Sequence, residues 1–558
     1  MSEPDALGSA NLARLLDELL AFDLSASPVL ASGLGLTEYD DRLDDLSAEA
    51  FARRDAFAAA HLAKLDALAD VSLEVDDAID RELARAVLRG RLAVADFEAW
   101  RRDPVTYSGP ITSGIFSLFL HRLRPEAEIV DAAINRLGRA GDAIDAGIAN
   151  LDAALAHPLI LERGRNAAQG GVRYLRELVA LDVEDAQDRA RLLAAGDRAA
   201  SHLERWVVHL DGLIPRATGT WQLGEERYTR ILREREVLAD DARGLRARGQ
   251  AEFDRLDAEM RGLSLAATGS EDYVAAIRAN DADHPATEQA MLEGYAAWTA
   301  KARAFLAETG LVSLLDGEAC AVVPSPVFQR PVLGVASYIA PPAFSESWQG
   351  HFFVPFAPDG ATEEDVQGRL ANNSFGSMPT TAVHEAYPGH HWHLVMRKGN
   401  PRTLRRVYST PYFNEGWALY AERAMREQGF FTDALHELQH LNATLFRAAR
   451  IVVDTSLHLG EMTFEEAVAF MRDRAALPEP VAVAEVGRYC SWPTQASSYL
   501  TGCLDILRIR DRYLAIRGYA GLPAGEVPVE VLRNFHDALA SSGSLPLGLA
   551  ERAVLASA

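Results

Sequence analysis

Cysteine is scarce in this sequence, and so is positive charge. The three cysteines, Cys320, Cys490 and Cys503, are scattered and odd in number, which is not the pattern of a disulfide framework or a zinc ribbon. Acidic residues outnumber basic ones by 80 to 56, which gives a formal net charge of −24. This excess argues against a nucleic-acid partner, because binding a phosphate backbone requires basic patches.

Long apolar runs are also missing. No stretch approaches the roughly 18 consecutive apolar residues that a membrane-spanning helix needs. The N-terminal segment MSEPDALGSANLARLLDELLAF carries acidic residues where a secretory signal needs basic ones. We therefore expect a cytoplasmic protein with no membrane partner, and the sequence gives no indication of its oligomeric state.

The spacing of apolar residues predicts a mainly α protein. From Asn11 to about Leu315, Leu, Ile and Val recur at three- and four-residue steps with charges between them. Near Ala319 the sequence becomes rich in Val, Phe, Tyr and Pro, which indicates short strands, and after Glu363 the helical pattern resumes. We expect a large bilobal helical fold with one small antiparallel β-sheet. Residues 1–315 would form a helical scaffold half and residues 316–558 a half with the sheet and the catalytic helices, the two halves belonging to one continuous fold.

The segment AVHEAYPGHHWHL, Ala382 to Leu394, combines four histidines and a glutamate with Pro388-Gly389. Ser377 with Pro379 predicts a helix start before it, and Lys398-Gly399 predicts the end. Such a crowd of imidazoles is either a divalent metal site at a broken helix or a surface patch without function. The apolar setting favours the metal site.

His384-Glu385 begins a helical His-Glu-x-x-His pattern, in which two imidazoles one turn apart reach one zinc ion. Position 388, however, is proline. On a regular helix His390 would lie about 9 Å along the axis and about 120° round it, too far to share an ion. Pro388 removes a helical hydrogen bond and Gly389 permits unusual backbone angles, so a bulge of about two residues can restore the spacing. This makes His390 the second expected ligand, with His391 as the alternative.

The third ligand is expected on the following helix, for which Thr410 and Pro411 are the start signal. Glu415 lies there in an apolar setting that would not otherwise favour a carboxylate. Glu422, two turns further on nearly the same face, could hold one of the histidines in orientation. Alternatively, Glu422 could pair with a nearby arginine.

A literal match to the short zinc motif occurs elsewhere, in HELQH, His436 to His440, followed by Glu465. We interpret it as an ordinary polar helix face, since five-residue patterns recur by chance in helix-rich chains. Thr463 with Glu466 forms a capping-box pattern that already accounts for the acidic residues there.

Four segments in this order resemble the bacterial family called domain of unknown function 885: HEAYPGHH, EGWALYAE, RAARIVVDTSLH and YCSWPTQASSYLTG. The resemblance spans roughly Gly224 to Gly502. It implies the helical fold with a deep groove of the thermostable zinc carboxypeptidases, and hence a gluzincin-type metallopeptidase. It also implies His384, His390 and Glu415 as ligands and Glu385 as base, and it gives HELQH no role.

These residues predict a metal-dependent peptidase of short peptides, carboxypeptidase activity being one form, with one Zn²⁺ per chain. Glu385 would activate a metal-bound water. Other divalent metals also suit two imidazoles and a carboxylate. Tyr499 is the first candidate for the oxyanion donor, before Tyr489 and His458.

Several features stay open at this level. Arg508 or Arg510 could bind a substrate carboxylate, and the strand GHFFVPF could pair with an extended substrate. The same site could hydrolyse a non-peptide amide or ester. If His391 or His393 were a fourth ligand, the metal would instead be a structural ion in a non-catalytic binding protein.

Overall fold

The structure is a computed structural model that describes residues 3–68, 73–181, 183–327, 329–330, 334–358 and 360–558. Contacts divide it into two compact units: unit one is Met1–Leu223 with Pro342–Ser347, and unit two is Gly224–Pro341 with Trp348–Ala558. The change in composition near residue 315 does not coincide with this division. Helices before it, α11 (Ala242–Thr268) and α13 (Glu288–Thr309), pack on helices that follow it in the chain.

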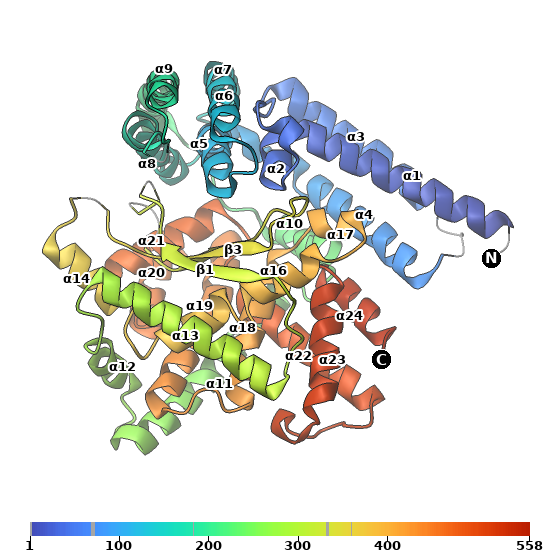
Figure 1. The fold of residues 1–558 in the computed structure, drawn as a ribbon, viewed down its shortest axis with the longest axis vertical. Helices are drawn as coiled ribbons and strands as arrows, with labels where there is room; N and C mark the ends of the chain where they lie inside the picture. The colour runs from blue at the N-terminus through green and yellow to red at the C-terminus, as the bar shows by residue number, and fades with distance from the viewer. Residues whose placement is uncertain (1–2, 69–72, 182, 328, 331–333, 359) are drawn as a thin grey trace. The chain divides into compact units, whose positions relative to one another are not determined.

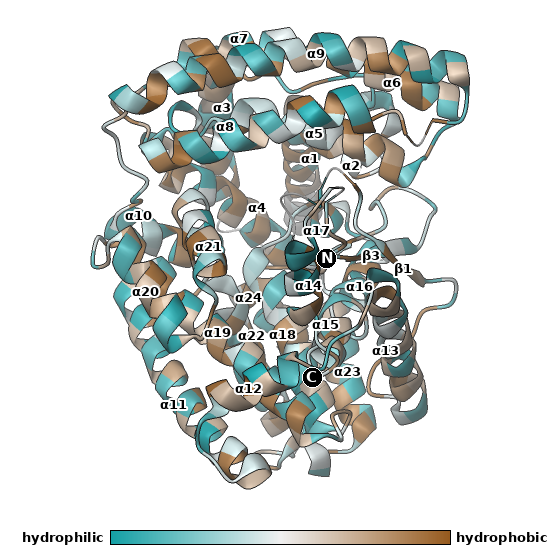
Figure 2. Cartoon of the chain, turned by 90° about the vertical axis from the view of Figure 1, so that its left-hand side faces the viewer, coloured by the Kyte–Doolittle hydropathy of each residue, from teal (hydrophilic) through white to brown (hydrophobic). Residues whose placement is uncertain are grey.

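Unit one is helical throughout its described secondary structure. Polar side chains start several of its helices; Ser47, for example, accepts a hydrogen bond from the amide of Ala50. In addition to short 3-10 and π segments it contains α1 (Glu3–Ala26), α2 (Pro28–Gly33), α3 (Ala48–Asp66), α4 (Val75–Ala93), α5 (Val105–His121), α6 (Glu126–Leu137), α7 (Ala140–Asn150), α8 (Pro158–Arg173) and α9 (Ala186–Leu213). Figure 2 shows hydrophilic and hydrophobic residues alternating along α9, as expected of a helix that buries one face.

Unit two contains the remaining helices and the sheet. Its elements are α10 (Glu225–Arg230), α11, α12 (Tyr273–Asp281), α13, β1 (Ala319–Pro324), β2 (Ser337–Ile339), β3 (Gln349–Val354), α14 (Glu363–Ala371), α15 (Met378–Glu385), α16 (His390–Lys398), α17 (Thr403–Val407), α18 (Pro411–Glu427), α19 (Ala434–His458), α20 (Phe464–Arg474), α21 (Glu479–Ser491), α22 (Ser498–Ile516), α23 (Val529–Ser541) and α24 (Leu547–Leu555). The predominance of helix that the sequence predicts is confirmed.

The small sheet differs from the expected antiparallel one. Its strand order is β1-β3-β2, with β1 parallel and β2 antiparallel to β3. The sheet is mixed because the chain leaves β1, forms β2 and then returns between the two as β3. As the middle strand, β3 is paired on both sides, so the prediction that GHFFVPF offers an edge to substrate is wrong. Figure 1 shows α13 running beside this sheet.

The helices that carry the site form the core of unit two. α18 packs along α22, and both also contact α19, which packs along α11. Gly416 and Gly502 allow the close approach of α18 and α22: a Cβ at Gly416 would stand 2.5 Å from the Gly502 Cα. The three cysteines are free, as expected. Within the described ranges, no helix has the length and apolarity that crossing a bilayer requires.

Candidate metal centre

A break between two helices shapes the His-rich segment. α15 ends at Glu385 and α16 begins at His390, with a cis peptide bond between Tyr387 and Pro388. Across the break, the amide of Gly389 donates to the Val383 carbonyl at 3.0 Å and the amide of Trp392 to the Ala386 carbonyl at 3.2 Å. Each bond spans six residues, whereas an α-helical bond spans four. The expected bulge of two residues is therefore present.

Gly389 makes this bulge possible through close approach. A Cβ at this position would lie 2.0 Å from the carbonyl oxygen of His384 and 2.2 Å from that of Val383. Trp417 of α18 secures the same turn, since its indole N–H donates to the Pro388 carbonyl at 2.7 Å. The side chain of any other residue would push α16 away from α15.

The bulge brings His384 and His390 together with Glu415 of α18. Their ligand atoms all lie within 4.8 Å of one another. The Glu415 carboxylate is 3.7 Å from His384 Nε2 and 3.4 Å from His390 Nε2, and the two imidazole rings are nearly perpendicular. Donors about 2.1 Å from a tetrahedral ion are about 3.4 Å apart, so these spacings and this donor set fit a zinc-sized cation.

Electrostatics at this cluster favour a cation. Burial opposes charge on His384, but the carboxylates of Glu415 and Glu422 outweigh burial and raise the pKa of His384 to about 9. Burial likewise opposes ionisation of Glu415, yet its histidine partners hold its pKa well below the usual range. A divalent cation can replace the proton that these carboxylates hold on the imidazole.

Glu422 anchors His384 from the side opposite the cluster. It is fully buried, and Glu422 Oε1 pairs with His384 Nδ1 at 2.7 Å, which leaves Nε2 facing Glu415. Its other oxygen lies 3.2 Å from His440 Nδ1. Burial opposes ionisation of Glu422, but these two histidines lower its pKa to about 2. Of the two alternatives for Glu422, the structure favours orientation of a histidine.

His391 faces away from the cluster. Its Nε2 lies 2.6 Å from the buried carboxylate of Glu318, and its Nδ1 lies 2.8 Å from the Tyr338 hydroxyl. The hydroxyl of Tyr387 and the guanidinium of Arg303 also donate to Glu318. Sequence reasoning missed this anchor, because Glu318 precedes a strand about 70 residues upstream and carries no motif. His390 rather than His391 therefore joins His384.

His393 also lies outside the cluster. Its Nε2 is 3.2 Å from the Asn414 side-chain oxygen, and burial lowers its pKa to about 3. Within the described part of the chain, the only group that could hold a metal ion has three members, His384, His390 and Glu415. Neither of the two histidines considered as a fourth ligand belongs to it.

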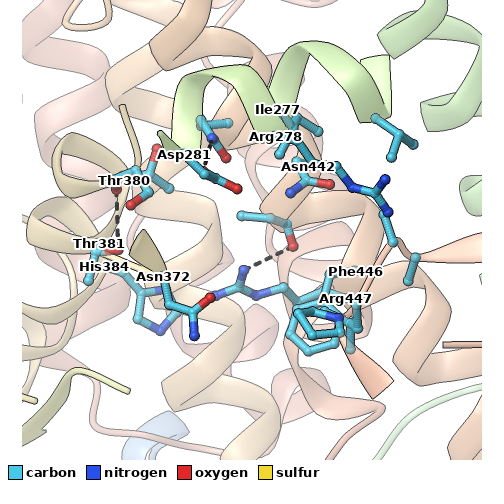
Figure 3. Close-up of a pocket in the computed structure, with 18 of the residues that line it drawn as sticks. Ile277, Arg278, Asp281, Asn372, Thr380, Thr381, His384, Asn442, Phe446 and Arg447 are labelled. Atoms are coloured by element: carbon cyan, nitrogen blue, oxygen red, sulfur yellow. Dashed lines mark hydrogen bonds between the residues drawn. The ribbon is translucent and has the colours of Figure 1, made fainter. Parts of the chain in front are cut away.

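Glu385 is buried beside the cluster, 8% exposed, and lines a cavity of about 500 Å³ together with His384. Burial raises its pKa above the ordinary value, although His384 and His390 oppose the rise. Figure 3 shows this cavity, with His384 and Thr381 on one side and Phe446 and Arg447 on the other. A carboxylate of raised pKa next to a candidate metal site is suited to proton transfer.

The three candidate oxyanion donors have different surroundings. The Tyr499 ring lies nearly parallel to His384, with centroids 6.5 Å apart, and its hydroxyl accepts from Gln495. The Tyr489 hydroxyl instead donates to Glu485 at 2.7 Å. His458 is buried against the Tyr489 carbonyl. Tyr499 is the candidate that lies next to the cluster.

Arg508 and Arg510, the two candidates for binding a substrate carboxylate, are engaged elsewhere. Arg510 pairs with Glu427 at 2.6 Å, and Arg508 pairs with Glu551 at 2.9 Å. Neither lines the cavity beside Glu385. The cavity contains Arg447 instead, which sequence reasoning passed over because nothing in its local pattern marks it.

Within the described residues, the HELQH segment does not belong to a group that could hold a metal ion. The His436 ring packs edge-on against Trp298, and Glu437 pairs with Arg426 at 2.5 Å. The segment does, however, contribute His440 as a partner of Glu422. The predicted capping box of Thr463 is present at the start of α20.

Comparison with known proteins identifies a family match. The family model described as "Bacterial protein of unknown function (DUF885)" matches residues 28–554. A search of curated proteins found no match.

Two solved structures share the fold. One, described as a "putative lipoprotein of unknown function" from Shewanella oneidensis, has a TM-score of 0.76 and 20% identity, over 98% of this chain and 99% of the other. The second, described as "the putative lipoprotein" from Colwellia psychrerythraea, has a TM-score of 0.80 and 19% identity, with the same coverage. At this identity the likeness establishes the fold alone.

Proposed function

The chain belongs to the bacterial DUF885 family, and we propose that it is a metal-dependent peptidase that hydrolyses short peptides, with zinc as the metal. One observation carries the proposal: the bulge at Pro388-Gly389 brings His384 and His390 to Glu415 while Glu385 lines the adjoining cavity. The order of these residues along the chain is that of gluzincin peptidases. We propose further that its fold and site resemble those of the thermostable zinc carboxypeptidases.

His384, His390 and Glu415 would hold the ion. Three protein ligands leave a further position on zinc, which supplies Lewis acidity and lowers the pKa of a water there. Glu422 keeps His384 in the orientation that presents Nε2. Outer partners of this kind fix the tautomer and rotation of a ligating imidazole.

Glu385 would act as the general base and then as the acid. No hydrogen bond or ion pair occupies its carboxylate within the described residues, and burial raises its pKa, so it can take a proton. It would accept the proton of the attacking water and deliver it to the amine that leaves. Proton transfer by a positioned group of this kind contributes about 10²- to 10⁴-fold to rate.

Tyr499 would donate a hydrogen bond to the oxygen of the carbonyl under attack. Burial raises its pKa, so the hydroxyl keeps its proton. The guanidinium of Arg450 lies over the Tyr499 ring, 4.7 Å from its centroid. An ion pair with Glu485 keeps Arg450 in this position. This stacking fixes the ring beside His384.

The test measures metal content and hydrolysis on the same purified chain. We expect about one zinc per chain and cleavage of dipeptides or blocked peptides, abolished by a chelator and restored by zinc. Glu385→Gln should abolish turnover and leave the zinc content unchanged; loss of zinc would make this residue a ligand. Cleavage of only non-peptide amides or esters would refute the peptidase assignment. Bound zinc without hydrolysis of any class would indicate a structural ion.

A further inference from the structure

The cavity beside Glu385 contains an arginine that has no ion-pair partner among the described residues. Among the described residues, the guanidinium of Arg447, on α19, donates a hydrogen bond only to the Ala443 carbonyl of its own helix, at 2.9 Å. Its Nε is buried without a partner. Across the described ranges no carboxylate lies within ion-pairing distance of it, in contrast to Arg450, which pairs with Glu485 at 2.9 Å.

Burying this N–H group without an acceptor makes folding less favourable. A buried N–H that has lost water and gained no acceptor costs about 1–3 kcal/mol. Arg447 lines the cavity together with His384 and Glu385, and it is near enough to lower the pKa of both Glu385 and Glu422. In Figure 3 its guanidinium points into the cavity. An unpaired, delocalised cation in a concave site is suited to a carboxylate ligand.

The rest of the lining fits the same kind of ligand. Arg278 and Asn442 add a second cation and an amide, and neither side chain has a hydrogen-bond or ion-pair partner within the described ranges. Ile277, Leu477 and Pro478 supply an apolar wall. The one carboxylate of this wall outside the metal region, Asp281, is already bonded to Gln439 and Ser374. The cavity volume of about 500 Å³ is within the range of small-ligand sites.

Arg447 also lies close to the expected oxyanion donor. Its guanidinium is 6.0 Å from the Tyr499 ring centroid. The cation is therefore beside the cluster, where the terminal residue of a short substrate bound at the cluster can meet it.

We propose that Arg447 binds the terminal carboxylate of the substrate, so that the enzyme removes single residues from the C-terminal end of short acyl peptides. The proposal rests on the proposed peptidase function and specifies its substrate class. Arg447 is then the specificity-determining residue, with Arg278 and Asn442 in support. An apolar last side chain would lie against Ile277 and Leu477.

Binding and hydrolysis test this with one pair of probes, N-benzoyl-glycyl-phenylalanine and its C-terminal carboxamide. Calorimetry on zinc-loaded Glu385→Gln chain should show the free acid binding at least about 10-fold more tightly than the amide. Adding Arg447→Gln should weaken binding of the free acid by about 10- to 100-fold, as expected for the loss of one charged hydrogen-bonded pair. Binding of the amide should not change. Arg447→Lys should retain part of the preference. The control Arg472→Gln, which removes an exposed arginine of α20 that pairs with Asp473, should retain all of it.

Equal binding of acid and amide, or a preference that survives Arg447→Gln, would overturn the inference. Hydrolysis by the wild-type chain separates it from the proposed function. If neither probe is cleaved but the acid still binds through Arg447, the peptidase assignment fails and the carboxylate site stands. If acid and amide are cleaved equally well, the peptidase assignment stands and the inference fails. Unfolding temperatures of the variants within a few degrees of wild type exclude misfolding.

Discussion

Replacing Gly389 by alanine should separate the two imidazoles. The new Cβ would start 2.0 Å from the His384 carbonyl oxygen, whereas real Cβ atoms essentially never come within 3.0 Å of such atoms. The backbone must therefore move by at least 1 Å, and the neighbour is a main-chain oxygen that cannot rotate away. Metal–ligand distances tolerate only about 0.2 Å. Since α16 begins at the next residue, His390 would be displaced directly.

We expect Gly389→Ala to lower zinc affinity by about 100-fold or more, at the upper end of what disturbing a ligand's support costs. Overpacking should also reduce stability by about 1–3 kcal/mol. Competition with a chromophoric chelator measures the affinity, and urea unfolding measures the stability. Gly399→Ala is the matched control at the other end of α16, because its Cβ would be 3.4 Å from the nearest atom, in ordinary contact. Zinc affinity in Gly389→Ala within about threefold of this control would refute the role given to the bulge.

Three further predictions address the groups around the proposed ion site. Glu422→Gln should weaken zinc binding by about 10- to 100-fold, because the charge that orients its histidine is lost; Glu427→Gln on the same helix should not, and equal losses would contradict the assignment. Elemental analysis should find no zinc in His390→Ala and most of the zinc in His391→Ala; the opposite result would make His391 the ligand. Tyr499→Phe should reduce kcat by about 100-fold with little change in KM, and an unaltered kcat in steady-state assays would remove it from the mechanism.

Local signals in the sequence were sufficient for the helices that carry the site. Thr410 caps α18 by accepting from the Tyr412 amide, with Pro411 in the first turn, and α16 ends at Lys398 as expected. These features depend on neighbours in the chain, which the sequence displays directly. The two-residue bulge could also be inferred, because only such an insertion restores the spacing of His384 and His390.

Features that depend on distant partners were visible only in the structure. The sequence favoured His390 but left His391 open, because the choice depends on Glu318 and Tyr338, which bind His391 from beside and within the sheet. Nor could it show that His440, within a motif without a metal, supports Glu422.

The sequence by itself determined that this is a helix-rich chain with a broken zinc-type motif and a carboxylate on the next helix. Tertiary structure alone decided the mixed sheet, the direction in which each histidine points and which arginines line the cavity without an ion-pair partner. The physical reason is that periodicity and capping are local, whereas burial, ion pairing and convergence on a cation depend on side chains from helices far apart in the chain.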